Sequence, residues 1–304
     1  MSTDSGAGVW FGLFLPQLRM SFETILERAL AAEAAGFDSV WLMDHLAAPA
    51  APEWDTLEGW TLAAGLATRT RRIRLGHLVT CDPFRHPAVL AKMAATVDVL
   101  SDGRLELGLG WGSVEAELRT FGIVAGPAAE RAARLRETLE ILPRMFSGEP
   151  FDHAGGHYRL EGARGRPVPV QERIPVHIGG AGAKLTMPLV REFADWWNCP
   201  SYAADRLAEL RPLAGDARVS VQHPVGLAAG ADDRNEVGDV VARRFGSWGG
   251  VVTGTPSEVV DALVADVALG ARGFVLQFHD FRTATTLERF MAEVAPAVRA
   301  AAGG

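Results

Sequence analysis

The stretch that decides the fold is Phe22–Leu42, "FETILERALAAEAAGFDSVWL". Apolar residues recur at helical spacing as far as Gly36, and a glycine is typical of a helix end. The run Phe37–Met43 then ends in four consecutive apolar residues, Val40–Met43, which is typical of a strand that is buried on both faces. The same order of helix, glycine and buried strand returns at residues 269–278, "LGARGFVLQF". This repeat is typical of an α/β protein with a parallel sheet.

Buried apolar runs alternate with helical patterns along the whole chain. Eight runs are predicted strands: Val9–Leu15, Phe37–Met43, Ile73–Val79, Arg104–Gly110, Ile174–Gly179, Ala194–Asn198, Val219–Gly226 and Gly273–Phe278. Eight β/α units in 304 residues predict a (β/α)8 TIM barrel that forms a single domain over residues 1–304. A doubly wound open sheet is the alternative, but no G-x-G-x-x-G follows the first strand, "FGLFLPQ".

Three connections are longer than a barrel requires: His45–Glu58, Ser147–Glu172 and Phe245–Gly254. In the second, the turn residues Ala154–Gly156 are flanked by alternating residues, which predicts a β-hairpin followed by an extended Pro-rich segment. Insertions of this length after strands commonly form a lid or an oligomer contact. We therefore expect Trp248, in the third insertion, to be a lid residue.

Composition excludes several classes of protein. The net charge of -7 argues against nucleic-acid or acidic-membrane partners, which require a surplus of basic side chains. The two cysteines, Cys81 and Cys199, are far apart and form no redox or metal motif, so we expect reduced thiols. No signal-peptide pattern and no apolar run of about 20 residues occurs, which predicts a cytoplasmic protein.

Strand ends are where a barrel places its active site. The residues there are polar but seldom charged, and no His-x-His pattern predicts a metal site. Glu115 and Glu117 lie near the fourth strand, but no carboxylate ends the seventh strand to complete a glycosidase pair. The two lysines, Lys92 and Lys184, are not at strand ends, which argues against Schiff-base chemistry.

Two glycine-rich turns follow predicted strands. "HIGGAG", His177–Gly182, precedes a helix that we expect to begin near Ala183, so its backbone amides can point at an anion, with added charge from Lys184. The alternative is a tight turn that needs glycine for positive φ. "GLGWGS", residues 108–113, would allow a flat ligand to approach the backbone closely.

Taken together, these segments resemble the luciferase-like monooxygenases, the bacterial-luciferase superfamily of flavin- and deazaflavin-dependent barrel enzymes. The resemblance covers nearly the whole chain in the right order, and within the superfamily the chain is most similar to the actinobacterial coenzyme F420-dependent branch. The segments that carry it are "FGLFLPQ", "AAGFDSVWLMDHL", "RIRLGHLVTCDPFRHPAVLAKMAATVDVLSDGRLELGLGWGSVEAELRTFGI", "IPVHIGGAGAKLTMPLVREFADWWN" and "GTPSEVVDALVADVALGARGFVLQF".

The resemblance implies a catalytic pair at the end of the second strand. His45 would face the flavin ring as a base or substrate contact, and Asp44 would orient the backbone or His45. A non-prolyl cis peptide would fall at Leu78–Val79 and back the ring, and Thr80 would reach the polar edge of the ring.

The glycine turns would border the ring and hold the phosphate of the cofactor. The further cofactor-binding positions that the resemblance implies are Gly110, Trp111, Gly112, Gly179, Gly180, Ala181 and Gly182. Ser113 departs from the sugar-phosphate dehydrogenase branch, which carries an acidic proton donor at this position. The departure argues against glucose-6-phosphate as the substrate.

Aromatic residues near strand ends indicate an apolar pocket. We expect a wall that favours a small, apolar or aromatic substrate, formed by Trp54, Trp60, Trp111, Trp196 and Trp197. Trp10 and Trp41 lie within strands and are predicted core residues, and His77 is a predicted core or barrel-interior histidine whose hydrogen bonds are satisfied.

Three functional hypotheses follow. The first is an oxidoreductase that binds F420 and moves a hydride to or from an organic substrate. The second is a two-component monooxygenase that uses reduced FMN, oxygen and a partner flavin reductase. The third, a nonenzymatic flavin-binding protein, is disfavoured by the presence of the acid-histidine pair and both glycine turns. The resemblance also implies a homodimer.

Overall fold

The structure is a computed structural model, and it describes residues 8–49, 51–124, 126–280 and 283–303. The strands are β1 (Trp10–Phe14), β2 (Ser39–Leu42), β3 (Arg74–His77), β4 (Thr80–Cys81), β5 (Leu105–Gly110), β6 (Phe151–Ala154), β7 (Arg159–Ala163), β8 (Val176–Gly179), β9 (Trp196–Cys199), β10 (Arg218–Leu227), β11 (Val252–Gly254) and β12 (Ala271–Phe278). The helices are α1 (Phe22–Ala35), α2 (Gly59–Ala67), α3 (Pro87–Leu100), α4 (Glu115–Thr120), α5 (Ala128–Phe146), α6 (Thr186–Phe193), α7 (Leu207–Leu210), α8 (Arg234–Phe245), α9 (Pro256–Ala268), α10 (Ala284–Arg289) and α11 (Ala295–Ala302).

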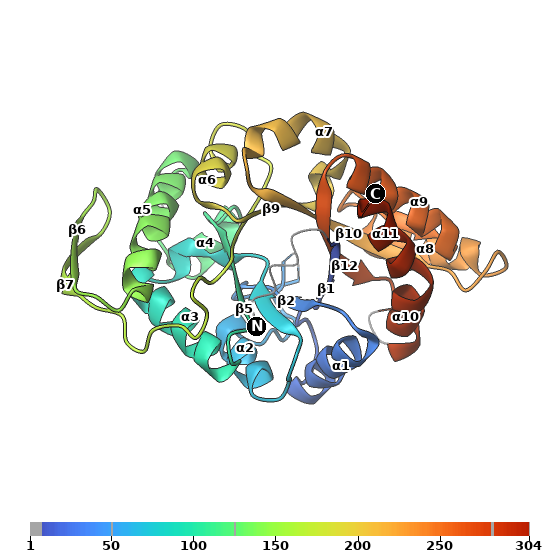
Figure 1. Cartoon of the computed structure of the whole chain (residues 1–304), viewed down its shortest axis with the longest axis horizontal. Coiled ribbons are helices and arrows are strands. Elements are labelled where there is room, and N and C mark those ends of the chain that lie inside the picture. Colours follow the sequence, from blue (N-terminus) through green and yellow to red (C-terminus); the bar gives the residue numbers. More distant parts are fainter. Residues whose placement is uncertain (1–7, 50, 125, 281–282, 304) are drawn as a thin grey trace.

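The eight predicted strands form a closed parallel barrel surrounded by helices, which confirms the TIM-barrel prediction (Figure 1). The order around the barrel is β1, β2, β3, β5, β8, β9, β10 and β12, and β12 pairs with β1 to close it. Closure leaves these strands without a free edge. The short strands β4 and β11 are additions that pair with β5 and β10.

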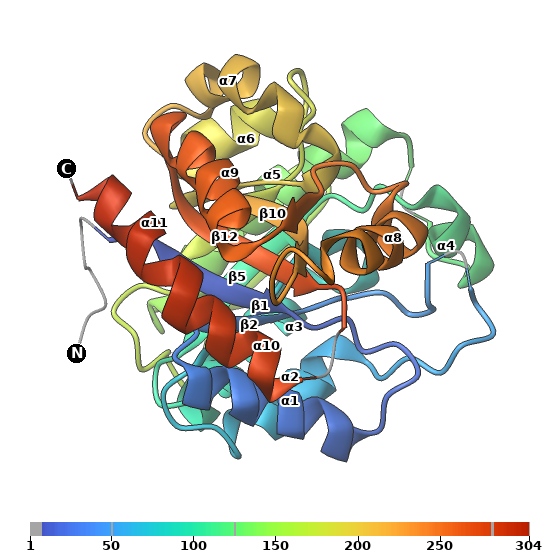
Figure 2. The ribbon, with the colours of Figure 1, turned by 90° about the vertical axis from the view of Figure 1, so that its right-hand side faces the viewer.

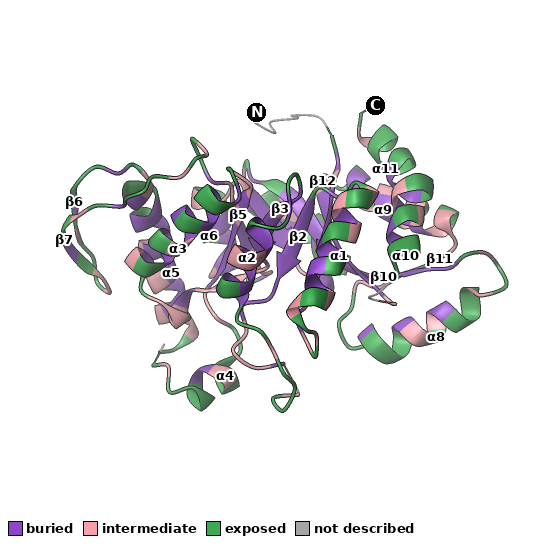
Figure 3. Ribbon diagram, turned by 90° about the horizontal axis from the view of Figure 1, so that it is seen from below, coloured by how far each residue is buried: buried purple, intermediate pink, exposed green. Residues whose placement is uncertain are grey.

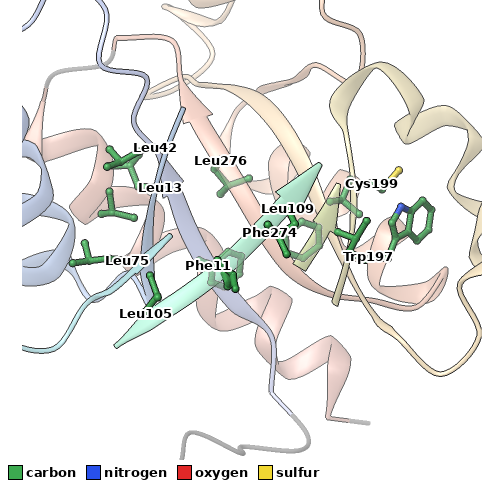
Figure 4. Close-up of a cluster of buried hydrophobic side chains, with 14 of the residues drawn as sticks. Phe11, Leu13, Leu42, Leu75, Leu105, Leu109, Trp197, Cys199, Phe274 and Leu276 are labelled. Carbon is green, nitrogen blue, oxygen red and sulfur yellow. The ribbon is translucent and has the colours of Figure 1, made fainter. Parts of the chain in front are cut away.

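Apolar side chains fill the layer between the barrel and its helices. Phe11 and Leu13 of β1, Leu75 of β3 and Phe274 of β12 belong to this layer, together with other residues of the strands (Figure 4). Figure 3 shows the central strands buried and the exposed positions on the outer faces of the helices. Successive strand residues point to opposite sides of a sheet, so this outward set alternates with an inward set.

The barrel interior holds a smaller aromatic cluster. Phe14, Trp41 and Val275 belong to it, so Trp41 is a core residue as predicted, whereas Trp10 is half-buried and packs against the cluster. Gly12 makes room for this cluster, because a Cβ atom there would lie 2.5 Å from Nε1 of Trp41. Glycine and tryptophan on neighbouring strands thus pack closely against each other in the interior.

The long connections project from the barrel. Residues 147–172 contain the predicted hairpin, in which β6 and β7 pair antiparallel and extend away from the barrel (Figure 1). Figure 2 shows α4 and α8 at the end of the barrel opposite α11. Among the described helices, none combines the length and the apolarity needed to cross a membrane.

Candidate functional site

A cavity of about 510 Å³ lies at the carboxyl ends of the strands, where a barrel places its active site. Residues that the sequence predicts for the site line this cavity: Asp44, His45, Leu78, Val79, Gly110, Trp111, Gly112, Gly179, Gly180, Ala181 and Gly182. Thr80 is the exception, since its side chain is fully buried and it does not line the cavity. Strand alternation explains this, because its neighbours Val79 and Cys81 are the residues that face the cavity. A second cavity of similar volume, between α1 and α10, contains none of the predicted residues.

Asp44 is a structural anchor, and both of its carboxylate oxygens are engaged. Arg85 donates to Oδ2 at 2.6 Å and to Oδ1 at 2.9 Å, and the backbone amide of Cys81 donates to Oδ2 at 2.8 Å. The pair is almost fully buried, with 2% of the Asp44 side chain and 10% of the Arg85 side chain exposed. The carboxylate therefore ties the end of β2 to the segment after β3, in line with the orienting role expected for it.

His45 lies beside Asp44 but has a different partner. Its Nδ1 is 2.8 Å from Oε2 of Glu117 on α4, and about a third of its side chain, 30%, is exposed. The other carboxylate oxygen of Glu117 accepts the backbone amides of Leu46, at 2.7 Å, and Ala47, at 3.3 Å. Burial alone would raise the pKa of Glu117, but the bonds from His45 and the two amides bring it below its usual value. The ring is thus held by an ionised carboxylate.

The peptide between Leu78 and Val79 is cis, as the resemblance predicts. The Val79 side chain packs between two glycines of neighbouring strands. A Cβ atom on Gly110 would lie 2.5 Å from one Val79 methyl carbon, and a Cβ atom on Gly179 would lie 2.8 Å from the other. These two glycines are therefore required by the packing of Val79, a role that the sequence pattern does not reveal.

The turn after β8 presents unused backbone donors. The amides of Ala181, Gly182 and Ala183 donate no hydrogen bond within the described residues, and Gly180 has the positive φ of 128°. Helix α6 begins at Thr186, three residues later than predicted, and Lys184 is exposed and does not line the cavity. Backbone amides without a partner, in a turn that contains a residue with positive φ, are able to bind an anion.

Trp111 connects the two glycine turns. Its indole N–H donates to Oγ1 of Thr186 at 3.1 Å, and the guanidinium of Arg131 lies 5.3 Å from the centre of its ring. The turn after β5 and the start of α6 are thereby held together at the cavity wall.

Several lining residues are not among the predicted site residues, although Cys81 and Asn198 lie at or near the ends of predicted strands, which is the signal that could have found them. Besides Glu117, which a local pattern could only connect with a glycosidase pair, they include Cys81, Val114, Asn198, Tyr202, Arg206 and Gln222. Burial and the Asp44 carboxylate raise the pKa of the Cys81 thiol, so it remains protonated and is a poor nucleophile.

The prediction of a tryptophan-walled pocket is wrong, because Trp111 is the one member of the set that lines the cavity. Trp60 is buried against His77, Trp196 packs on Trp10 at the opposite end of the barrel, and Trp197 is fully buried. Trp54, which is 40% exposed, lies under the guanidinium of Arg19. Whether the side chain of a strand residue points into or out of the barrel depends on barrel closure. The spacing of aromatic residues in the sequence does not indicate that direction.

Two other predictions need correction. Trp248 packs against Phe245 and does not line the cavity, so it is not a lid residue of this site. His77 is buried as predicted, but neither ring nitrogen has a partner among the described residues, and its ring stacks on Trp60 of α2. Burial lowers the pKa of His77 and keeps the ring neutral.

A closed parallel barrel with a cavity at its carboxyl end, a histidine held by a carboxylate and a turn with unused backbone amides is the arrangement of a barrel enzyme with a ligand site. The family model of the luciferase-like monooxygenases matches residues 4–214. The chain therefore belongs to the luciferase-like monooxygenase family and is an oxidoreductase.

Curated relatives agree with this assignment, and a solved structure agrees with the fold. An F420-dependent glucose-6-phosphate dehydrogenase from Amycolatopsis mediterranei is 34% identical over 56% of this chain, and the match spans only 50% of that protein. One from Intrasporangium calvum is 28% identical over 90% of this chain and 94% of that protein. An F420-dependent secondary alcohol dehydrogenase, solved in complex with an F420-acetone adduct, superimposes with a TM-score of 0.81 at 18% identity, covering 96% of this chain and 99% of that chain. This last likeness supports the fold.

Proposed function

We propose that the protein is an F420-dependent oxidoreductase that transfers a hydride between the deazaflavin and a small, rather apolar organic substrate. The observation that carries the proposal is the cavity that joins His45 to the glycine turns after β5 and β8. The curated relatives, named as F420-dependent dehydrogenases, support the choice of cofactor.

The residues present fit such a cofactor. The unused amides of Ala181 and Gly182, which line the cavity, and of Ala183 beside them would hold its phosphate. Gly110 and Gly112 also line the cavity, and the space that a Cβ atom would take there is filled by Val79 at Gly110 and by Cys81 and Pro83 at Gly112. When bound, F420 supplies a carbon centre that accepts or donates two electrons together with one hydrogen.

His45 is the proposed catalytic base. It lines the cavity, its Nδ1 is held by Glu117, and Nε2 has no hydrogen-bond partner among the described residues. A base placed in this way can take the hydroxyl proton of an alcohol as the carbon-bound hydrogen leaves as hydride. Asp44 supports the site indirectly, because both of its oxygens are already bonded.

The lining of the cavity favours an apolar substrate over a sugar phosphate. Ser113 occupies the position where the resemblance implies an acid in the sugar-phosphate branch. Of the described residues, the one arginine that lines the cavity is Arg206, which is paired with Glu209 at 2.7 Å, and no lysine does so. Val114 and Tyr202 are exposed apolar and aromatic residues of the lining.

Cofactor titration and turnover test this function. We expect F420 to bind tightly and to be reduced in the presence of small secondary alcohols. His45→Ala should bind F420 normally and lose about 10²- to 10⁴-fold in turnover, the usual contribution of a general base, whereas His157→Ala, in the hairpin, should keep full activity.

Two results would contradict the proposal: full turnover by His45→Ala, or no F420 binding together with turnover on reduced FMN and oxygen. The second result would support the alternative, an FMN-dependent monooxygenase with a partner reductase. A homodimer and a cytoplasmic location are further proposals, which size-exclusion chromatography with light scattering and cell fractionation can test.

A further inference from the structure

Glu117 bonds the proposed base and the loop beside it at the same time. Its Oε2 lies 2.8 Å from Nδ1 of His45, and its Oε1 accepts the amides of Leu46 and Ala47. We infer that Glu117 is a positioning residue that fixes the tautomer of His45, with the proton on Nδ1 and a free lone pair on Nε2. The inference rests on the proposed function of His45 and states what makes that histidine a base.

The chemistry of the pair determines which nitrogen carries the proton. An ionised carboxylate can only accept hydrogen bonds, so the nitrogen that faces it must donate. Only 9% of the Glu117 side chain is exposed, and its Oε1 already accepts two backbone amides, so Oε2 is the oxygen that faces Nδ1 of His45. A neutral ring with its proton on Nδ1 has an unprotonated Nε2, and such a ring can take a proton from a substrate hydroxyl but cannot give one.

The backbone amides fix the direction of the carboxylate. Leu46 and Ala47 follow His45 directly, so Glu117 binds both the ring and the chain that carries it. This arrangement restricts rotation of the imidazole, and the fixed ring orientation favours proton transfer in one geometry.

The substitution Glu117→Gln distinguishes a residue that sets the tautomer of His45 from one that only holds the ring and the loop in place. Glutamine is isosteric, and its carbonyl oxygen can still accept the two amides. Its NH2 group would then face Nδ1 of His45 as a donor, which forces the ring proton onto Nε2. A purely structural role predicts that glutamine restores function, whereas a tautomer-setting role predicts that it does not.

The matched control is a second His–Glu pair outside the cavity. In the hairpin, Nε2 of His153 lies 3.3 Å from Oε2 of Glu137, and the two carboxylate oxygens of Glu137 also accept the amides of Gly156, His157 and Tyr158. Glu137→Gln makes the same chemical change in a similar setting. We expect it to leave F420 turnover unchanged.

Nitrogen-15 NMR of histidine-labelled protein without cofactor tests the inference directly, because the chemical shifts of the two ring nitrogens distinguish the tautomers. His45→Asn identifies the signals of His45. We expect the Nδ1–H tautomer in the wild type and the Nε2–H tautomer in Glu117→Gln. We also expect Glu117→Gln to bind F420 normally and to lose about 10²- to 10⁴-fold in alcohol oxidation, the range that a wrong tautomer or a lost base produces.

The inference is overturned by an Nε2–H tautomer in wild-type His45, by an unchanged tautomer in Glu117→Gln, or by full turnover of a variant whose tautomer is inverted. The spectra need no turnover, so they remain decisive if no alcohol proves to be a substrate. Failure of the proposed function would appear as absent F420-dependent turnover in the wild type, and failure of the inference as the wrong spectrum.

Discussion

Gly110→Ala should damage both the stability of the barrel and its ligand site. The added Cβ atom would lie 2.5 Å from Cγ2 of Val79. Nonbonded carbons need about 3.5–4.0 Å, so the two groups must separate by about 1 Å or more. Val79 cannot relieve this contact by rotating, because its other methyl carbon, Cγ1, already packs closely against Gly179. An added Cβ atom on Gly179 would lie only 2.8 Å from that methyl carbon. Overpacking of this kind typically costs about 1–3 kcal/mol in the free energy of unfolding.

Urea unfolding and F420 titration measure the two effects. We expect Gly110→Ala to lower the free energy of unfolding by about 1–3 kcal/mol and to weaken F420 binding, because Val79 lines the cavity. Val79→Ala removes the opposing methyl groups, so the double variant should recover much of the loss. Gly238→Ala is the control, since a Cβ atom there meets no atom within 4 Å. The reasoning fails if Gly110→Ala unfolds like the wild type, or if the two substitutions are additive within about 0.5 kcal/mol.

Two further predictions concern buried charge. Burial raises the pKa of Asp82 from its usual 3.8 to about 6. When the pH lies between these two values, the folded protein keeps a proton on Asp82 that the unfolded chain has lost. The free energy of unfolding therefore falls as the pH rises through this range. Asp82→Asn should therefore add about 3 kcal/mol to the free energy of unfolding at pH 8 and little near pH 4. Equal gains at both pH values, or a gain in the exposed control Asp239→Asn, would contradict this explanation. Arg85→Met should lower the free energy of unfolding by about 3–5 kcal/mol, because it leaves the Asp44 carboxylate buried without its partner; a loss below about 1 kcal/mol would show that the pair behaves as a surface pair.

The residue pattern within each short segment of the sequence was sufficient to predict the barrel architecture. Each strand is a short apolar run after a helix and a turn, and parallel strands with crossover helices have few ways to pack. The eight strands, the closed barrel and the hairpin of β6 and β7 could therefore be predicted. The glycine turns were located correctly for the same reason, although α6 begins at Thr186 and not near Ala183.

Contacts between distant segments were decided only by the tertiary structure. His45 and Glu117 are 72 residues apart, and Asp44 and Arg85 are 41 apart, yet both pairs meet at the cavity. The side of the sheet that a tryptophan occupies depends on barrel closure and strand register. For this reason, the spacing of tryptophans in the sequence predicted the wrong residues for the cavity wall. By itself the sequence determined the order of strands and turns, because that information is local. The partners of His45, Asp44 and Val79 were determined by closure of the barrel, which brings strand ends from separate β/α units to one cavity.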